Sequence, residues 1–287
     1  MQSLVSSTYL FLKKALHIFV VALLWSFLAQ IIPFVLISIG IDVTSSYSGM
    51  LISLVGEFIG IFAMYIYYRN TSYVLPPLKK NTLQHYLLGF SFGSLTFVFI
   101  WTIIYALGGY YIEVTFHLIN ILWLLAFLLG FAIQSFFEEL LCRGLIMGYW
   151  LKDGKVISAF FLNSIIFTFF HIGNPGFDIY AAAGLFMFAL LMSEIRFVSG
   201  NIWICSAFHA AWNFLEGSVL GTSVSGLPNI GLVIKSINTT STQRLTGGAF
   251  GVERSSSAII VYGLLVTIIF ILLVLKRKDN FPLFRTK

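Results

Sequence analysis

The chain has 287 residues, of which 59% are hydrophobic and only 10% carry a charge, and its mean hydropathy is +0.94. Soluble domains carry about 25% charged residues, so this composition excludes a soluble protein. The net charge of +6 does not indicate nucleic-acid binding, because the basic residues gather beside the apolar segments. Cys142 and Cys205 lie inside apolar segments, so no disulfide framework is predicted.

Eight apolar segments are candidates to cross about 30 Å of hydrocarbon. In chain order they cover approximately residues 15–38, 48–68, 86–108, 118–150, 156–172, 179–198, 201–220 and 257–275. We therefore predict an all-α fold, a polytopic membrane protein of about eight transmembrane helices. Residues 1–287 form a single transmembrane domain, with a core at approximately 118–220, an outer loop at approximately 221–256 and a last helix at 257–275.

The distribution of Lys and Arg orients these segments. Lys13 and Lys14 precede the first segment, and most of the 17 basic residues fall on its side of the membrane if the segments alternate in direction. Lys235, Arg244 and Arg254 share the one long loop on the other side, where charge has less influence on topology. We predict a multi-pass protein of the cell membrane with both termini in the cytoplasm.

The fourth segment, 118–150, contains two adjacent acidic residues, Glu138 and Glu139. A charged side chain at the centre of a bilayer costs roughly 2.5 to 3.5 kcal/mol on insertion scales and usually marks a functional site. Spacings of one, three and four place a polar stripe on one helical face, formed by Gln134, Ser135, Glu138, Glu139, Cys142 and Arg143. At 1.5 Å per residue this segment is longer than the hydrocarbon, so it must tilt, protrude or break.

Two other segments carry polar residues at helical spacing. Segment 156–172 has Ser164, Thr168 and His171, and segment 201–220 has Ser206, His209, Asn213 and Glu216. With the predicted topology, the acidic pair, His171 and Asn213 lie at similar depths from the inner side. We expect these side chains to meet at a buried cavity between the fourth, fifth and seventh helices.

The residue types at this cavity are suited to the hydrolysis of an amide. A carboxylate and an imidazole that hold one water can act as a general base. A second imidazole and a carboxamide can stabilise the oxyanion that develops on the attacked carbonyl. Glu139 and Arg143 are spaced i, i+4 in the favourable order, so they can pair with each other and leave Glu138 free to bind water.

Three ordered motifs carry a resemblance to a known family. They read Glu138-Glu139-Leu-Leu-Cys-Arg143, Phe167-Thr-Phe-Phe-His171 and His209-Ala-Ala-Trp-Asn213. This ordered set resembles the CAAX-protease and bacteriocin-processing group (CPBP, also called Abi) of intramembrane glutamate proteases, in its bacterial branch. The resemblance implies an eight-helix fold in which Glu138 and His171 activate the water, His209 and Asn213 form the oxyanion hole, and Glu139 and Arg143 support the helix.

The function that follows from the resemblance is an intramembrane endopeptidase, a hydrolase of the CAAX protease type. Its partners would be the lipid bilayer and a membrane-associated peptide or a lipidated protein, and the substrate itself cannot be deduced from the sequence. Two alternatives stay open: a non-catalytic protein of the same fold that acts in bacteriocin self-immunity or as a scaffold, and an ion- or proton-coupled transporter. Transporters usually contain internal repeats, and none is evident in the sequence.

The resemblance implies no cofactor and no metal. Zinc is the alternative, because Glu138, His171 and His209 are ligand types that zinc accepts. The sequence has no His-Glu-x-x-His motif, however.

Other acidic residues in apolar segments have no predicted chemical role. Glu57 in the second segment matches no residue of the family. Glu194 and Glu216 are expected to serve packing. Residues Val252-Glu253-Arg254 differ from the pattern often found before the last helix of bacterial members, so no function is assigned to them.

Overall fold

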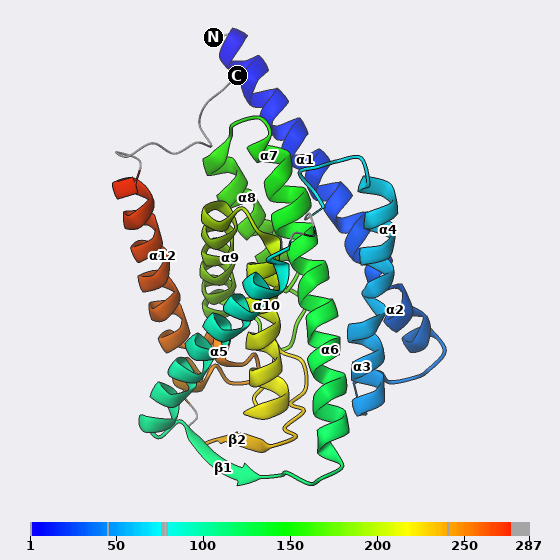
Figure 1. Cartoon of the computed structure of the whole chain (residues 1–287), viewed down its shortest axis with the longest axis vertical. Coiled ribbons are helices and arrows are strands. Elements are labelled where there is room, and N and C mark those ends of the chain that lie inside the picture. Colours follow the sequence, from blue (N-terminus) through cyan, green and yellow to red (C-terminus); the bar gives the residue numbers. More distant parts are fainter. Residues whose placement is uncertain (1, 45, 76–77, 79, 240–241, 277–287) are drawn as a thin grey trace.

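The computed structural model describes residues 2–44, 46–75, 78, 80–239 and 242–276 (Figure 1). Its helices α1–α12 and strands β1 and β2 run in chain order, with π-helical segments η1 and η2 and a 3₁₀ turn η3. The bounds are α1 (Gln2–Ala29), α2 (Ile31–Ser38), α3 (Tyr47–Gly56), α4 (Phe58–Tyr68), α5 (Thr82–Ala106), β1 (Tyr110–Val114), α6 (Asn120–Glu139), η1 (Leu140–Ile146), α7 (Met147–Leu151), α8 (Val156–Phe169), α9 (Ile179–Ser199), α10 (Ile202–Asn213), η2 (Phe214–Val219), β2 (Ile234–Asn238), α11 (Gln243–Thr246), η3 (Val252–Arg254) and α12 (Ser256–Lys276).

The predicted all-α polytopic membrane fold is confirmed. Among the described residues, six helices are long and apolar enough to cross a membrane, and α8 is a shorter apolar helix. The predicted seventh segment, 201–220, is helical too, but it divides into α10 and η2. The start of α1 and the end of α12 lie toward the same end of the molecule, as an even number of crossings requires (Figure 1).

Two predicted spans are interrupted where the sequence suggested one continuous helix. The first breaks at Gln30, between α1 and α2, and the second breaks at Glu57, between α3 and α4. Pro33 explains the first break, because proline has no backbone N–H to donate and is tolerated only in the first turn of a helix. At Glu57 the apolar composition of the flanking residues gave no sign of a break.

Close packing of α5 against α10 fixes the position of the helix that carries His209. Gly89 and Gly93, one turn apart on α5, contact the backbone of Ile204 and Phe208, and a Cβ atom at either glycine would collide with a carbonyl oxygen. Small residues four apart allow two membrane helices to approach this closely. The crossing of these two helices is visible at the centre of Figure 1.

A small antiparallel sheet closes the end of the molecule away from the start of α1 (Figure 1). Strand β1 pairs with β2, and the register aligns Tyr110 with Asn238 and Val114 with Ile234. This sheet was not predicted, because the segment 221–256 was interpreted as loop. The pairing connects the loop after α5 to the loop that follows the candidate site helix α10.

Asp178 joins two elements at this end. Its Oδ1 accepts hydrogen bonds of 3.0 Å from the backbone N–H groups of Tyr180 and Ala181 and so caps α9. Its carboxylate also accepts two bonds from the Arg254 guanidinium, at 3.0 Å and 2.5 Å. The hydrogen bonds from Arg254 lower the pKa of Asp178 below its ordinary value of 3.8.

Asp178→Asn is expected to lower the melting temperature at pH 7, because the amide keeps a cap acceptor and loses the ionic bond to Arg254. Since the folded pKa of Asp178 is depressed, its ionic stabilisation is present above pH 3.8 and disappears as the pH falls through the folded value. Asp178→Ala also loses the cap, which costs about 1 kcal/mol more. Thermal unfolding in detergent across pH 3 to 7 measures both effects.

Asp153→Asn serves as the control for this series. Asp153 pairs with Lys14 at 2.8 Å, but both side chains are about one-third exposed, so the pair is expected to contribute little. The prediction is contradicted if Asp178→Asn lowers the melting temperature no more than Asp153→Asn does. It is also contradicted if the decrease for Asp178→Asn is as large at pH 3 as at pH 7.

Candidate active site

The four residues predicted to be catalytic surround one cavity of about 460 Å³. Glu138 comes from the last turn of α6, His171 from the turn after α8, and His209 and Asn213 from α10. The rest of the wall comes from α1, α2, α3 and the residues that follow each of them, including Gln30 and Glu57, and from the loop after η2. Side chains from three segments that are distant in the sequence therefore line one cavity.

Glu138 has one occupied and one free carboxylate oxygen. Its Oε1 accepts a hydrogen bond of 2.8 Å from Gln134 Nε2, one helical turn earlier. Its Oε2 is buried and has no hydrogen-bond partner among the described residues, and it lies 3.8 Å from His209 Nε2. This arrangement holds the carboxylate in place and leaves an acceptor for a water molecule in the cavity.

Glu139 and Arg143 form the ion pair expected from their spacing. Arg143 Nη1 donates to Glu139 Oε1 at 3.0 Å, and neither side chain is exposed. Arg143 also donates to the carbonyl oxygen of Ala189 at 3.0 Å and lies over the ring of Phe167, with its Cζ 4.9 Å from the ring centroid. The guanidinium thus connects α6, α8 and α9 directly beneath the cavity residues.

The same Glu139 oxygen orients His209. The distance from His209 Nδ1 to Glu139 Oε1 is 3.1 Å, and since a carboxylate accepts, Nδ1 donates. The ring nitrogen that remains, Nε2, faces Glu138. Phe188 packs edge-on against the imidazole, with ring centroids 5.0 Å apart, and restricts its rotation. The sequence reasoning gave Glu139 only the role of a partner for Arg143 and missed this contact.

His171 lies just outside a helix, although the predicted helix extended to residue 172. The helix α8 ends at Phe169, and His171 follows in a turn. Its Nδ1 is 2.9 Å from the carbonyl oxygen of Phe167, and since a carbonyl can only accept, Nδ1 carries the hydrogen. This bond leaves the Nε2 lone pair available, and His171 lies within electrostatic range of Glu138 across the cavity.

Asn213 and Glu138 are connected through Gln134. Asn213 Nδ2 donates to Gln134 Oε1 at 3.1 Å, while Gln134 Nε2 donates to Glu138. The amide group of Gln134 therefore fixes the positions of both side chains at once. Gln134 belonged to the predicted polar stripe without a role, and its i, i+4 spacing to Glu138 was the signal that could have identified it.

The helix that carries the first motif changes to π-helix within that motif, and the helix that carries the third motif changes directly after it. On α6 the change follows Glu139, and on α10 it follows Asn213. Short π-helical segments occur frequently at functional sites, and irregular backbone within a membrane is tolerated where it is buried in protein or lines a cavity. The backbone itself therefore indicates a specialised site at this depth.

Three other polar residues of the predicted stripes, Ser164, Thr168 and Glu216, do not line the cavity and bond to nearby backbone or side-chain groups. Ser164 and Thr168 donate to backbone carbonyl oxygens of their own helix. Glu216 accepts from the Trp212 indole at 2.9 Å and from the backbone N–H of Val252 at 2.7 Å, which ties α10 to η3. Glu253 accepts from Ser225, and burial raises the pKa of Glu253.

Among the residues that the structure describes, no group of three or more His, Cys, Asp or Glu side chains is close enough to hold a metal ion. The cavity side chains are engaged in hydrogen bonds with protein groups instead: Glu138 with Gln134, His209 with Glu139, and His171 with Phe167.

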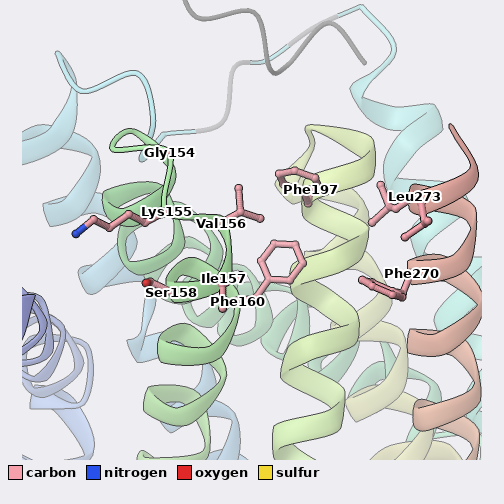
Figure 2. A pocket seen from close by; sticks show the side chains of 10 residues that line it. Gly154, Lys155, Val156, Ile157, Ser158, Phe160, Phe197, Phe270 and Leu273 are labelled. Atoms are coloured by element: carbon pink, nitrogen blue, oxygen red, sulfur yellow. The ribbon is translucent and has the colours of Figure 1, made fainter. Parts of the chain in front are cut away.

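A second cavity of about 580 Å³ lies between the start of α8, α9 and α12 (Figure 2). Its walls are mainly apolar and include Phe160, Phe197 and Phe270. The ammonium group of Lys155 points away from it, over the rings of Phe11 and Trp150. Since its lining contains no carboxylate or imidazole, this larger cavity does not compete with the first as a reaction site.

Fold and site together define a polytopic membrane protein with a polar cavity enclosed by its helices. Residues 119–215 match the family model described as "Type II CAAX prenyl endopeptidase Rce1-like". This stretch is similar to that family over about a third of the chain, and it contains all three motifs. Neither the curated proteins nor the solved structures gave a match.

Proposed function

We propose that this protein is an intramembrane endopeptidase that hydrolyses a peptide bond by means of a water molecule activated by Glu138 and His171. The observation that carries the proposal is the free, buried Oε2 of Glu138 in a cavity shared with two histidines and an asparagine. A buried carboxylate oxygen without a protein partner requires a donor, and water supplies one. The family description supports the same reaction class.

The reaction follows from the positions of the groups. A water molecule between Glu138 Oε2 and His171 Nε2 gives a proton to the carboxylate as its oxygen attacks the peptide carbonyl. In the proposed mechanism His209 carries a proton on both ring nitrogens, so that Nδ1–H donates to Glu139 and Nε2–H donates to the oxyanion, which also accepts the second amide hydrogen of Asn213. The C–N bond then breaks, and the proton taken up by Glu138 passes to the departing amine.

The substrate is proposed to be a membrane-associated peptide or protein with a prenylated C-terminal CAAX sequence, in line with the family description. The site is proposed to work in the cell membrane with both termini in the cytoplasm. Cleavage would require neither a covalent enzyme intermediate nor a metal. Cys142 contacts the cavity but is fully buried, and it has no assigned part in the reaction.

Incubation of the purified protein with a fluorescent S-farnesyl CAAX peptide tests this proposal. We expect the release of a C-terminal tripeptide, detected by mass spectrometry, at a rate that a zinc chelator such as 1,10-phenanthroline leaves unchanged. A rate that falls with the chelator and returns on addition of zinc identifies a metallopeptidase instead. Binding of the peptide without any cleavage indicates the non-catalytic alternative, a scaffold or immunity protein.

A further inference from the structure

A second acidic residue lines the candidate active-site cavity from outside the three motif helices. Glu57 lies at the break between α3 and α4, lines the same cavity as Glu138, and is only 4% exposed. It interacts electrostatically with Glu138. The family match begins at residue 119, so neither the motifs nor the comparison assigns Glu57 a role.

The hydrogen bonds of Glu57 are incomplete. Gln30 Nε2 donates to Oε1 at 2.5 Å and fixes the carboxylate from α1 and α2. The other oxygen, Oε2, is buried and has no partner among the described residues. An unpaired acceptor at a cavity wall costs free energy unless an incoming donor satisfies it, so this oxygen indicates a ligand contact.

The helix break at Glu57 supports the same interpretation. The span from residue 47 to residue 68 is apolar and is interrupted only at this residue. Glu57 keeps helical backbone angles, and a local irregularity of this kind is tolerated within a membrane where it is buried in protein or lines a cavity. Glu57 and Gln30 both lie at such breaks, and their side chains meet there.

We propose that Glu57 is a substrate-positioning residue whose Oε2 accepts a hydrogen bond from a main-chain N–H group of the bound peptide. The backbone N–H groups of an extended peptide inside a cavity need hydrogen-bond acceptors from the protein, because bulk water is not present to accept from them. The N-terminal part of the wall, residues 26–57, offers Oε2 of Glu57 for this purpose, while Glu138 Oε2 is reserved for the water. The inference rests on the proposed function and adds to it how the peptide is held.

The test measures binding without cleavage. The S-farnesyl CAAX peptide and a series with one peptide nitrogen methylated at a time are titrated against the Glu138→Gln protein in detergent, with Kd from fluorescence anisotropy. We expect Glu57→Leu to weaken binding of the unmodified peptide about tenfold. One peptide of the series, the one methylated at the nitrogen that donates to Glu57, should bind about tenfold more weakly than the unmodified peptide when Glu57 is present. Its Kd should not rise further when Glu57 is replaced by Leu.

The matched control is Glu194→Leu, which also removes a buried carboxylate with one unpaired oxygen, but one that does not line the cavity. Its Kd should equal that of the parent. If Glu57→Leu does not elute as folded protein, Glu57→Met replaces it, since Met has a similar length and no carboxylate acceptor.

The outcomes separate the two proposals. An unchanged Kd for the Glu57 variants, or N-methylation effects that are the same with and without Glu57, overturns the positioning role. Cleavage that survives Glu138→Gln overturns the proposed function and does not affect the comparison of Kd values. A peptide that binds to none of the proteins overturns the positioning role together with the proposed substrate class.

Discussion

Glu138→Gln is expected to abolish peptide cleavage, with a fall in initial rate of at least about 10³-fold. The amide oxygen can still accept the hydrogen bond from Gln134, so the side chain keeps its place. It cannot take a proton from water, however, and the nucleophile is no longer generated. Rates of product release at equal amounts of membrane-inserted protein measure the loss.

Glu194→Gln is the matched control for this substitution. Glu194 is a buried carboxylate near the C-terminal end of α9 and does not line the cavity. The substitution should therefore leave the cleavage rate within about twofold of the parent. Normal cleavage by Glu138→Gln would show that another group activates the water. A biological effect, such as bacteriocin immunity, that persists after cleavage has been lost would support the scaffold alternative.

Glu139→Leu is expected to destabilise the protein by about 3 to 5 kcal/mol, the usual cost of leaving one member of a buried ion pair without its partner. Arg143 would keep its bond to Ala189, but its charge would face a fully buried environment. His209 would lose the acceptor for its Nδ1–H as well. The free energy of unfolding in mixed micelles, obtained from denaturant titration, measures the effect.

The double variant Glu139→Leu/Arg143→Met separates the two roles of Glu139. Without the arginine there is no uncompensated charge, so most of the lost stability should return. His209 still lacks its acceptor in this variant, so kcat should remain about tenfold or more below the parent while KM changes little. If kcat recovers together with stability, Glu139 has a structural role alone, and the proposed orientation of His209 is wrong.

The parts of the site that follow regular helical spacing could be predicted from the sequence. Hydropathy located the spans, and the i, i+4 relations placed Glu139 beside Arg143 and His209 on the same helix face as Asn213. These inferences depend on one helix at a time, and helix geometry is nearly invariant. That the three helices bring these side chains together was predicted only from the similar depths of the acidic pair, His171 and Asn213 in the membrane.

Contacts between distant segments could not be predicted in the same way. Gln30 and Glu57 lie 27 residues apart, and their pairing depends on two helix breaks that averaged hydropathy does not detect. The sheet between β1 and β2 joins segments more than a hundred residues apart, so neither sequence alone indicates its partner. The contact of His209 with Glu139 likewise depends on how α6 and α10 rotate against each other.

The cavity is assembled from two structural sources, with consequences for how the family can diversify. The reacting groups come from α6, α10 and the turn after α8, whereas much of the remaining wall comes from residues 26–57. Changes in the N-terminal quarter of the chain can therefore alter which peptides are accepted while the chemistry stays intact. Recognition of new peptides can therefore evolve through substitutions in this N-terminal quarter, without changes in the helices that carry the reacting groups.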